Sequence, residues 1–280
     1  MILSFHPNIV AEKNILCAGR PPDVGDRVAI SQASAVILPQ GCSEALYRMC
    51  REHCPHIFPN YDVRFDFPGK LGQARLFQEM GVTHPPTLTF ETVTAYDEEG
   101  QQRVGKQPFG FPCVFKSDWG GEGEGVFLIR TPDELETVLA RARDDERSGR
   151  KGFLLQTYIP SGGRSLRVAV IGDQFFSYWR AHENPSQFLV SVKNGAAVDH
   201  HADPELQEIG KSVVKAFCSQ TGINLAGFDL LFSQKEERPA PFLLEINYFF
   251  GRRGLGGSLN YYKLVDKAVS AWLEGLGLTL

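Results

Sequence analysis

The sequence lacks several features that mark particular classes of protein. It has no run of about 18 consecutive apolar residues, so we expect no membrane-spanning helix. The first residues, MILSFHPNIVAEKN, have too short an apolar run and too acidic a flank for a signal peptide. The 29 basic residues stand against 33 acidic ones, and the net charge of −4 indicates no nucleic-acid-binding surface. Any anionic ligand must therefore be held by a local site.

The sequence also lacks a C-x-x-C pair, although it contains six cysteines. We interpret them as reduced thiols, in the core or at the surface of a cytoplasmic protein. They are Cys17, Cys42, Cys50, Cys54, Cys113 and Cys218. The alternative is a metal site, whose ligands would be Cys50, His53, Cys54 and His56. That segment lacks a second clear ligand pair and has a helical pattern, which favours the thiol interpretation.

The first third of the chain alternates short apolar runs with helical patterns. Residues 1–5 and 34–41 are apolar runs closed by proline or glycine, which predicts short buried strands. Ser43 is expected to cap a helix over residues 43–53. Strand, turn and helix in this order are typical of an α/β unit. A further helix is predicted over residues 71–80, stopped by the glycine that follows.

Strands and helices also alternate in the remaining two thirds. Thr131 is the expected N-cap of a helix over 131–147, with Pro132 at its first position and acidic residues in its first turn. Asp203 is the expected cap of a second long helix, over 203–222. Strands are predicted over 111–116, 125–130, 152–160, 165–181 (two, around a Gly-Asp turn), 224–233 and 241–249, and a last helix over 263–277.

A glycine-rich loop lies between the predicted strands 111–116 and 125–130. Its glycines are Gly120, Gly121, Gly123 and Gly125, and Lys116 precedes them. Glycines allow positive φ and a close approach to a ligand, so the loop can offer N–H groups to phosphate oxygens. Taken alone, the same composition fits a mobile hairpin tip equally well.

Three familiar phosphate-binding motifs differ from this loop in the order of their lysine, glycines and following element. A Walker loop ends in Gly-Lys-Ser/Thr and leads into a helix, whereas here the lysine comes first and a strand follows. The G-x-G-x-x-G spacing of dinucleotide sites is absent. Protein kinases carry the lysine on the strand after the loop. The chain therefore belongs to none of these three classes.

Three oxygen-bearing side chains lie on the two predicted strands near the C-terminus. Asp229 interrupts an apolar strand, and Glu245 and Asn247 stand two apart on the next, so the latter pair point to the same face. If the strands pair, the three converge on one spot, and hard oxygen ligands suit Mg²⁺. The alternative is a solvent-facing polar stripe, but the second strand is apolar on both sides. The pattern favours a metal site.

The segment LLQTYIP, residues 154–160, is an apolar strand that becomes polar at its end. An edge there could offer backbone groups to a purine, although a plain core strand is the simpler interpretation.

Together, these elements resemble the ATP-grasp superfamily. The lysine, the glycine loop, QTYIP, RVAVIGD and then an aspartate followed by E-x-N occur in that order, over roughly residues 65 to 260. The nearest likeness is to the amino-acid ligases of that superfamily, which include glutathione synthetases and ribosomal-protein glutamate ligases. The resemblance implies an α/β (α+β) chain with the ATP-grasp fold, in which two α/β lobes clasp the nucleotide.

The resemblance also implies a domain arrangement. A small N-terminal α/β domain is expected over residues 1–64, followed by the ATP-grasp domain over 65–280. Within it, the small lobe should span about 105–158 and the large lobe about 159–280.

Residue roles follow from the same resemblance. Lys70 and Lys116 match lysines that contact the nucleotide, and Gly120 to Gly125 match the loop that closes over the phosphates. The hinge that grasps adenine corresponds to Gln156, Tyr158 and Ile159. The catalytic arginines correspond to Arg167 and Arg180, with Arg180 the better match for the transferring phosphoryl group. The ligands of Mg²⁺ or Mn²⁺ correspond to Asp229, Glu245 and Asn247.

The chain departs from the family pattern in three places. Leu189 and Ser191 stand where many relatives have an arginine and an asparagine. IPSGGRS follows the hinge, where an acidic residue usually binds the ribose. GRRGLGG follows the E-x-N motif in place of a Pro-Gly turn, and its Arg252 and Arg253 could clamp a substrate carboxylate or phosphate. A solvated basic turn explains these arginines equally well.

The resemblance implies an ATP-dependent ligase that joins a carboxylate to an amine or thiol through an acyl phosphate. Two alternatives remain: an ATP-grasp phosphotransferase, and an ATP-binding module without catalysis, for which Leu189 and Ser191 would be the evidence. The expected partners are small carboxylates and amines, or a peptide or protein terminus, with neither nucleic acid nor membrane involved. A homodimer is left open.

Overall fold

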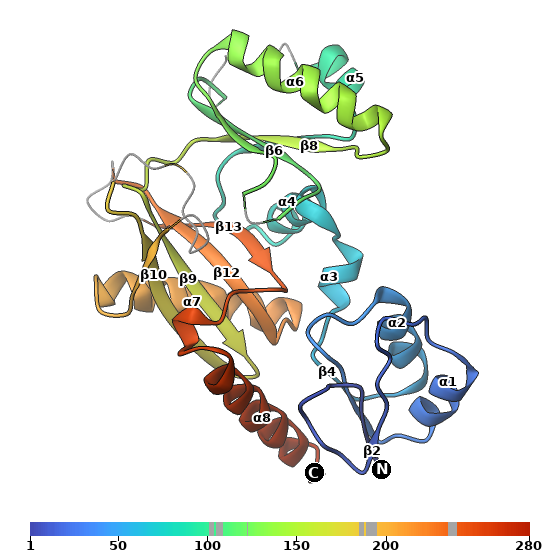
Figure 1. Ribbon diagram of the computed structural model, residues 1–280. Coiled ribbons are helices and arrows are strands. Elements are labelled where there is room, and N and C mark those ends of the chain that lie inside the picture. Colours follow the sequence, from blue (N-terminus) through green and yellow to red (C-terminus); the bar gives the residue numbers. More distant parts are fainter. Residues whose placement is uncertain (101–103, 105–108, 122, 185–187, 189–194, 235–239) are drawn as a thin grey trace.

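The computed structural model describes residues 1–100, 104, 109–121, 123–184, 188, 195–234 and 240–280. In this part of the chain, a small parallel sheet near the N-terminus is followed by two larger antiparallel sheets, as Figure 1 shows. No helix of the described residues is long and apolar enough to cross a membrane.

The N-terminal sheet is parallel, with the strand order β2-β1-β3-β4. Its strands are β1 (Ile2–Ser4), β2 (Lys13–Asn14), β3 (Ala35–Ile37) and β4 (Ile57–Phe58), and its helices are α1 (Val24–Ser31) and α2 (Glu44–His53). The predicted cap of α2 is confirmed, because Ser43 Oγ accepts the Leu46 N–H at 3.3 Å. Helix α1 was not predicted, since its signal is a short capping box between Asp23 and Asp26 rather than a long apolar repeat.

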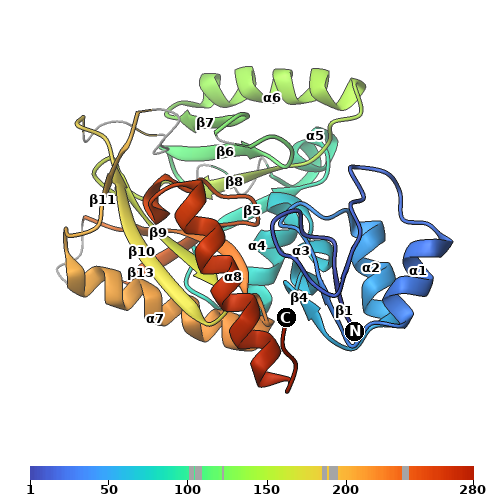
Figure 2. The same cartoon turned by 60° about the horizontal axis from the view of Figure 1, so that its bottom comes forward.

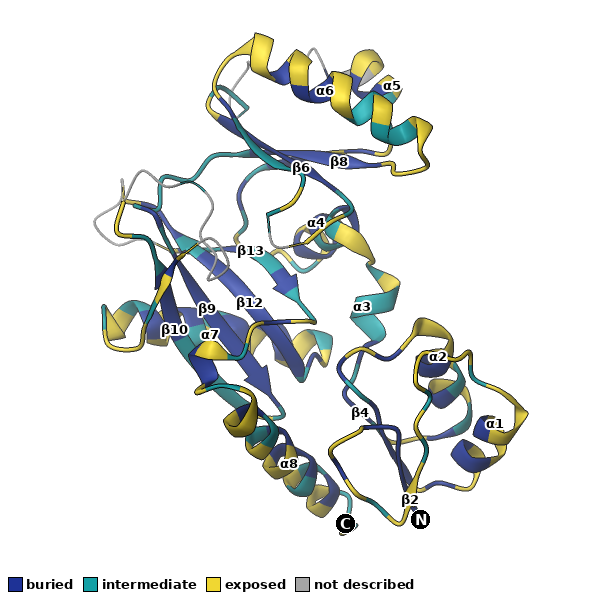
Figure 3. Cartoon of the chain, viewed as in Figure 1, coloured by how far each residue is buried: buried dark blue, intermediate teal, exposed yellow. Residues whose placement is uncertain are grey.

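A helical linker leads to the second sheet, whose order is β5-β8-β6-β7. The linker consists of α3 (Asp62–Asp66) and α4 (Gly69–Glu79), and the sheet of β5 (Thr87–Phe90), β6 (Cys113–Ser117), β7 (Val126–Ile129) and β8 (Phe153–Thr157). Between them lie α5 (Val93–Ala95), a π-helical turn (Tyr96–Gly100) and α6 (Pro132–Arg147). Phe115 and Phe153 pack toward α6, which leaves Lys116 on the opposite face because strand side chains alternate. Figure 3 shows the outer surface of α6 exposed and the strands beneath it buried.

The third sheet is antiparallel, with the order β11-β10-β9-β12-β13. Its strands are β9 (Arg164–Ile171), β10 (Gln174–Ala181), β11 (Ala197–Asp199), β12 (Leu225–Phe232) and β13 (Pro241–Asn247). Helix α7 (Pro204–Thr221) covers one face, where Leu166, Val168 and Val170 are buried against it. The alternate residues of β9 therefore face the other side.

Helix α8 (Ser258–Gly275) lies between this sheet and the N-terminal one, as Figure 2 shows from a second direction. Its buried residues form one apolar cluster with Ile37 and Phe58 of the N-terminal sheet and with Ala169 and Leu225 of the third sheet. A short 3₁₀ turn, Arg253–Leu255, precedes it. The C-terminal helix thus fastens the first residues of the chain to the large sheet.

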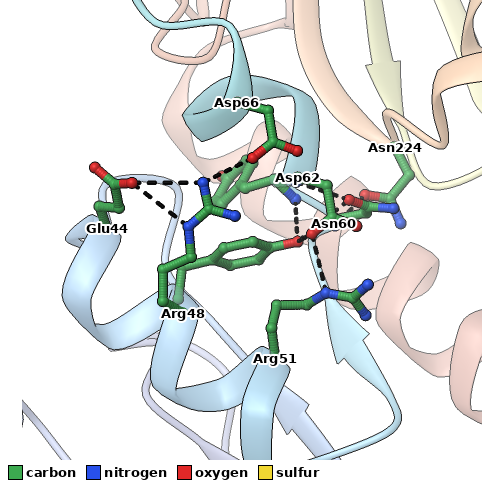
Figure 4. A network of polar contacts seen from close by, with 9 residues as sticks. Glu44, Arg48, Arg51, Asn60, Asp62, Asp66 and Asn224 are labelled. Carbon is green, nitrogen blue, oxygen red and sulfur yellow. Dashed lines mark hydrogen bonds and ion pairs between the residues drawn. The ribbon is translucent and has the colours of Figure 1, made fainter.

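A polar network joins the N-terminal unit to the linker and the third sheet (Figure 4). The Tyr47 hydroxyl donates to Asp62 Oδ1 at 3.0 Å, and the Asn60 N–H donates to Asn224 Oδ1 at 2.8 Å. Arg51 pairs with Asp62 at 2.9 Å. These contacts hold α3 in place. The predicted domain boundary at residue 64 falls within this helix and remains a prediction.

Two predicted details differ from the structure. Asp203 stands at the N-cap position of α7, but its side chain makes no capping hydrogen bond, because its backbone is left-handed (φ 44°) and its carboxylate pairs with Arg164. Helix α8 begins at Ser258 rather than near residue 263, since glycines at its start hid the first turn. The N-cap of α6, Thr131, is confirmed.

Candidate active site

A cavity of about 330 Å³ lies between the second and third sheets. We call it the inter-sheet cavity. It is lined by all of the predicted site residues except Gly120 and Gly125. Residues of β6 and β8 line it from the second sheet, and residues of β9, β12 and β13 line it from the third. Figure 1 shows these two groups of strands in separate sheets. The fold therefore gathers residues that are more than 170 positions apart in the sequence, such as Lys70 and Asn247.

The third sheet presents a row of polar side chains to this cavity. In the strand register, Tyr178 pairs with Arg167, Arg167 with Asp229, and Asp229 with Glu245. Paired residues of antiparallel strands point to the same face. The row therefore crosses four strands, and beside it a register irregularity leaves Leu244 of β13 unpaired between the pairs Asp229–Glu245 and Leu230–Leu243.

Asp229 is the centre of a buried ion-pair network. Its Oδ1 accepts from Arg167 Nε at 2.5 Å and pairs with Arg180 Nη2 at 2.8 Å. Its Oδ2 accepts from Arg167 Nη2 and from Asn247 Nδ2, both at 3.1 Å. Burial by itself would raise the pKa of Asp229, but the two guanidinium groups outweigh it and lower the pKa. The carboxylate is therefore held in its charged form.

Arg180 retains one unused donor. Its Nη2 donates to Ser165 Oγ at 2.8 Å, yet its Nε is buried and has no partner among the described residues. A buried, unpaired guanidinium N–H is costly. This N–H is therefore available to an acceptor such as a phosphate group.

Lys116 faces the row from β6. It is only 9% exposed, and burial lowers its pKa to about 8, with Glu245 acting in the opposite direction and Lys70 reinforcing the shift. A buried ammonium with a second lysine, Lys70, nearby is a suitable place for an anion. At neutral pH the group is still charged.

The predicted hinge lies at the end of β8. Gln156, Tyr158 and Ile159 all line the cavity. Gln156 Nε2 donates to Thr87 Oγ1 at 2.9 Å, so β5 fixes the orientation of this amide. The Tyr158 ring lies 6.1 Å from that of Phe188. This end of the cavity is aromatic and apolar, as a flat base requires.

The glycine loop forms the tip of the β6–β7 hairpin. Gly120, Gly123 and Gly125 have φ between 69° and 90°, which other residues rarely adopt. Gly121 and Gly123 line the cavity, whereas Gly120 and Gly125 shape the turn outside it. Lys70 Nζ donates to the carbonyl of Gly120 at 3.3 Å, so this predicted contact residue also holds the loop.

Sequence reasoning missed two residues that support the site. Gln73 on α4 clamps the main chain of Ile246: its Nε2 donates to the carbonyl at 2.9 Å and its Oε1 accepts the N–H at 2.8 Å. Asp118 accepts the Leu71 N–H at 2.8 Å and so ties the glycine loop to α4. Neither belongs to a motif, and only their tertiary contacts identify them.

Arg252 and Arg253 follow β13 at the rim of the cavity. The Arg252 guanidinium stacks on the Tyr261 and Tyr262 rings, 4.4 and 4.6 Å from their centres, and donates to the Tyr262 hydroxyl at 3.0 Å. Arg253 is exposed. Leu189 and Ser191, where the chain departs from the family pattern, lie outside the described residues.

The donor set fits a magnesium ion. Asp229, Glu245 and Asn247 bring two carboxylates and an amide oxygen to one face of β12 and β13. Mg²⁺ is commonly bound by one or two carboxylates together with substrate phosphates. Among the described residues, no three His, Cys, Asp or Glu side chains form a group that could hold a metal ion. The amide of Asn247 is therefore an essential member of the set. The cysteines of the alternative metal site, Cys50 and Cys54, are buried in the core of the N-terminal unit.

Comparison with known proteins identifies the family. The model of the RimK-like ATP-grasp domain matches residues 75–258. The chain belongs to the RimK-like ATP-grasp family. The resemblance inferred from its motifs and the predicted ATP-grasp fold are thereby confirmed.

Curated relatives of this family member include two probable alpha-L-glutamate ligases. The protein from Sodalis glossinidius (strain morsitans) is 27% identical over 147 residues, which cover 52% of this chain and 46% of that protein. One from Shewanella denitrificans is 30% identical over 149 residues, covering 52% and 45%. The chain therefore spans about half the length of the curated relatives it matches.

Solved structures share the fold. The RimK domain ATP-grasp protein from Sphaerobacter thermophilus has a TM-score of 0.63 at 14% identity, covering 95% of this chain and 98% of that one. D-alanine–D-alanine ligase from Bacillus anthracis has a TM-score of 0.59 at 14% identity, covering 94% and 84%. At these identities the likeness establishes architecture alone.

Proposed function

We propose that this protein is an ATP-dependent ligase that joins a carboxylate to an amine and releases ADP and phosphate. The observation that carries the proposal is the polar row on the third sheet, Arg167–Asp229–Glu245, which faces Lys116 across one cavity. The names of its relatives, which are probable glutamate ligases, support the same reaction class.

The proposed reaction has two steps. A carboxylate oxygen attacks the γ-phosphorus of ATP, the bond to the β–γ bridging oxygen breaks, and ADP leaves. The amine nitrogen then attacks the acyl carbon, the carbon–oxygen bond to phosphate breaks, and the amine gives up a proton as the amide forms. Both steps build negative charge on phosphate oxygens.

The chain's own residues supply positive charge for those oxygens. Lys116 approaches from the second sheet, and Arg180 can direct its unpaired Nε toward the transferring group. Arg167 remains paired with Asp229 and orients it. Mg²⁺ or Mn²⁺, held by Asp229, Glu245 and Asn247, would neutralise charge on the β- and γ-phosphates.

The remaining parts of the cavity would bind the nucleotide and shield the acyl phosphate from water. We assign the adenine to the hinge at Gln156, Tyr158 and Ile159, and the phosphates to the glycine loop and Lys70. Closure of that loop would exclude water from the acyl phosphate, which hydrolyses readily. The reaction would take place in the cytoplasm, on small substrates or on a peptide or protein terminus. The protein could act as a monomer or as a homodimer.

The test is an assay of ADP and phosphate release. The protein is incubated with MgATP, L-glutamate and other amino acids as amines, and a pool of small carboxylates and peptides. Release of both ADP and phosphate that depends on both substrates is the expected result. A phosphorylated acceptor would indicate a phosphotransferase instead, and tight ATP binding without turnover would indicate a binding module.

Two variants test the site assignment. We expect Lys116→Ala and Glu245→Gln each to slow turnover by about 10²–10³-fold, since each removes one charged contact to the phosphates or the metal. Lys215→Ala and Glu205→Gln make the same changes at exposed positions of α7 and should be unaffected. Full activity in both site variants would exclude this cavity as the active site.

A further inference from the structure

Strand β10 has an open edge. All of its residues pair with β9 on one side, but on the other side β11 pairs only with Trp179, Arg180 and Ala181. Within the part of the chain that the structure describes, residues 174–178 therefore have a neighbouring strand on one side alone. Alternate residues of an antiparallel strand direct their N–H and C=O groups to opposite sides. The first half of β10 thus presents backbone donors and acceptors without a strand partner.

The edge stays open because β11 ends in a turn at Asp199. Its Oδ1 accepts the N–H groups of His201 and Ala202 at 2.7 and 3.1 Å. The Ala202 carbonyl in turn accepts from Trp179 Nε1 at 2.8 Å and from Gln207 Nε2 at 2.9 Å. These bonds draw the chain toward α7 and away from the rest of β10.

A hollow of about 520 Å³ follows the open edge, and we call it the β10 groove. Phe175, Phe176 and Ser177 of β10 form its floor. One wall comes from α7, where Lys211 and Glu208 pair at 2.6 Å and leave the wall polar without net charge. The other wall comes from the 3₁₀ turn and α8. An extended chain in this groove would lie beside β10, as β11 does further along.

The two walls differ in chemistry. On the α7 side, Ser177 Oγ donates to Gln207 Oε1 at 2.8 Å. On the α8 side, Phe176, Leu255 and Leu264 belong to one apolar cluster. Successive side chains of a strand point to opposite faces of the sheet. An added strand would therefore set polar side chains against α7 and apolar side chains against α8.

Strand β11 already has this pattern on the same edge. Val198 packs with the apolar cluster on the α8 side, whereas its neighbours Ala197 and Asp199 are exposed. The chain's own strand thus occupies one half of the edge with an apolar residue turned toward α8. A strand with the same alternation fits the other half.

The opposite edge of this sheet is occupied. On β13, the Leu243 N–H donates to the Thr83 carbonyl at 2.8 Å, and the Ile246 N–H donates to Gln73 Oε1 at 2.8 Å. These contacts use backbone donors that an added strand would need. Of these two edges, β10 is therefore the one that can accept a further strand.

We propose that the β10 groove binds an extended segment of a partner protein, which adds to the sheet as a strand. The segment carries alternating polar and apolar side chains. Main-chain hydrogen bonds to β10 supply affinity, and the alternation of side chains supplies selectivity. Gly254 lines both this groove and the inter-sheet cavity, so a bound segment lies beside that cavity. The inference does not depend on the reaction proposed for the cavity.

The test uses synthetic peptides and the full chain. A panel of hexapeptides, blocked at both ends, alternates threonine or glutamine with valine, leucine or phenylalanine, and titration calorimetry measures binding. We expect at least one peptide to bind with a Kd below about 1 mM. A peptide of the same composition, with its polar and apolar residues grouped, should bind about 10-fold more weakly or worse, because it cannot match both walls.

N-methylation of the peptide tests the strand geometry. Methyl groups on alternate backbone nitrogens remove the donors of one edge of the peptide and leave those of the other. One methylated series should bind about 10-fold more weakly or worse, and the other should bind as the parent peptide does. Hydrogen exchange locates the site: bound peptide should slow amide exchange within residues 174–178 of β10.

A pair of variants places the peptide against α8. Leu264→Lys puts a charge into the apolar wall and should weaken binding by about 10-fold or more. Leu259→Lys is the matched control, because Leu259 lies on the same helix, is 74% exposed and does not line the groove. Hydrogen exchange on the wild type needs no substitution, so it decides the matter even where Leu264→Lys does not fold.

Four results would overturn the inference. The first is that no peptide of the panel binds, and the second is that both methylated series bind as the parent does. The third is that exchange slows elsewhere but not within residues 174–178. The fourth is a concentration-dependent dimer that protects these amides without peptide, which would make the occupant a second copy of this chain.

Discussion

Asp229 and Arg167 lie opposite each other on β12 and β9, and neither is more than 6% exposed. A charge at such a depth is tolerated because it is paired and hydrogen-bonded on several sides. The sequence reveals the aspartate as a polar residue in an apolar strand. Its arginine partner becomes visible only when the strands are in register.

His6 is a residue at which pH should act on stability. Burial in the first place, and the nearby Arg252 in the second, lower its pKa from 6.5 to about 4. Between pH 6.5 and pH 4, His6 is protonated in the unfolded chain but stays neutral in the folded protein. The stability that is present above pH 6.5 is therefore lost as the pH falls toward 4.

We expect the wild type to lose about 1–3 kcal/mol more than His6→Asn between pH 7 and pH 4. The asparagine can replace His6 Nδ1 as the acceptor for the Asn8 N–H. Urea unfolding at a series of pH values measures the difference. Parallel stability curves for the two proteins would contradict this account of His6.

Gly125 provides a test of the glycine loop. Its φ is +69°, and an added Cβ would lie 2.7 Å from Ser117 Oγ. We expect Gly125→Ala to lower the free energy of unfolding by about 1–3 kcal/mol and to raise the KM for ATP. Gly110→Ala is the control, because Gly110 has open space around it, has no positive φ and does not line the cavity. Similar behaviour of the two variants would show that the loop geometry is not constrained.

At the scale of secondary-structure elements, α4 connects the two halves of the site. Lys70 in its first turn holds a carbonyl of the glycine loop, the Leu71 N–H bonds Asp118, and Gln73 clamps β13 between Glu245 and Asn247. A single helix thus sets the distance between the phosphate loop and the proposed metal ligands.

Gln73→Leu should reveal this connection. The substitution leaves both main-chain groups of Ile246 unpaired, so the neighbouring ligands lose their support. We expect the Mg²⁺ concentration for half-maximal turnover to rise by roughly 10-fold, as for other residues that orient metal ligands. A titration of turnover with Mg²⁺ measures it.

Gln78→Leu, at an exposed position of the same helix, is the control for this prediction. A loss of thermal stability in Gln73→Leu with an unchanged Mg²⁺ requirement would mean that Gln73 has a purely structural role.

Element boundaries were predictable where local chemistry marks them. Thr131, Pro132 and the acidic first turn identify α6 without reference to the rest of the chain. The prediction that the Asp203 side chain caps α7 was wrong, because its carboxylate accepts a hydrogen bond from Arg164 on a distant strand. Local capping rules fail when a long-range ion pair competes for the same oxygen.

At the scale of the whole molecule, α8 is the element that holds three parts together. It packs against Ile37 and Phe58 on one side and Ala169 and Leu225 on the other. Its start lies beside Arg252 and Arg253 at the rim of the inter-sheet cavity. The packing of the N-terminal unit on the third sheet therefore depends on this helix.

Leu273 tests the packing of this helix. The residue is fully buried in the shared apolar cluster, and Leu273→Ala should cost about 2–5 kcal/mol of unfolding free energy. Leu259→Ala, on the same helix but 74% exposed, should cost less than about 0.5 kcal/mol. Urea denaturation compares them. Equal losses would mean that α8 is not fastened between the two sheets.

The sequence by itself determined the features that depend on near neighbours. The glycines after Lys116, the caps of α2 and α6, and the common face of Glu245 and Asn247 follow from composition, capping chemistry and the two-residue period of a strand. The order of these motifs was also sufficient to indicate the family.

Only the tertiary structure decided which distant residues meet. The strand order β10-β9-β12-β13 brings Arg167 to Asp229, and the packing of α4 brings Gln73 to the site. Strand register and helix packing are set by burial over the entire core, and no local pattern encodes them. Residues that act through such contacts cannot be identified from the sequence alone.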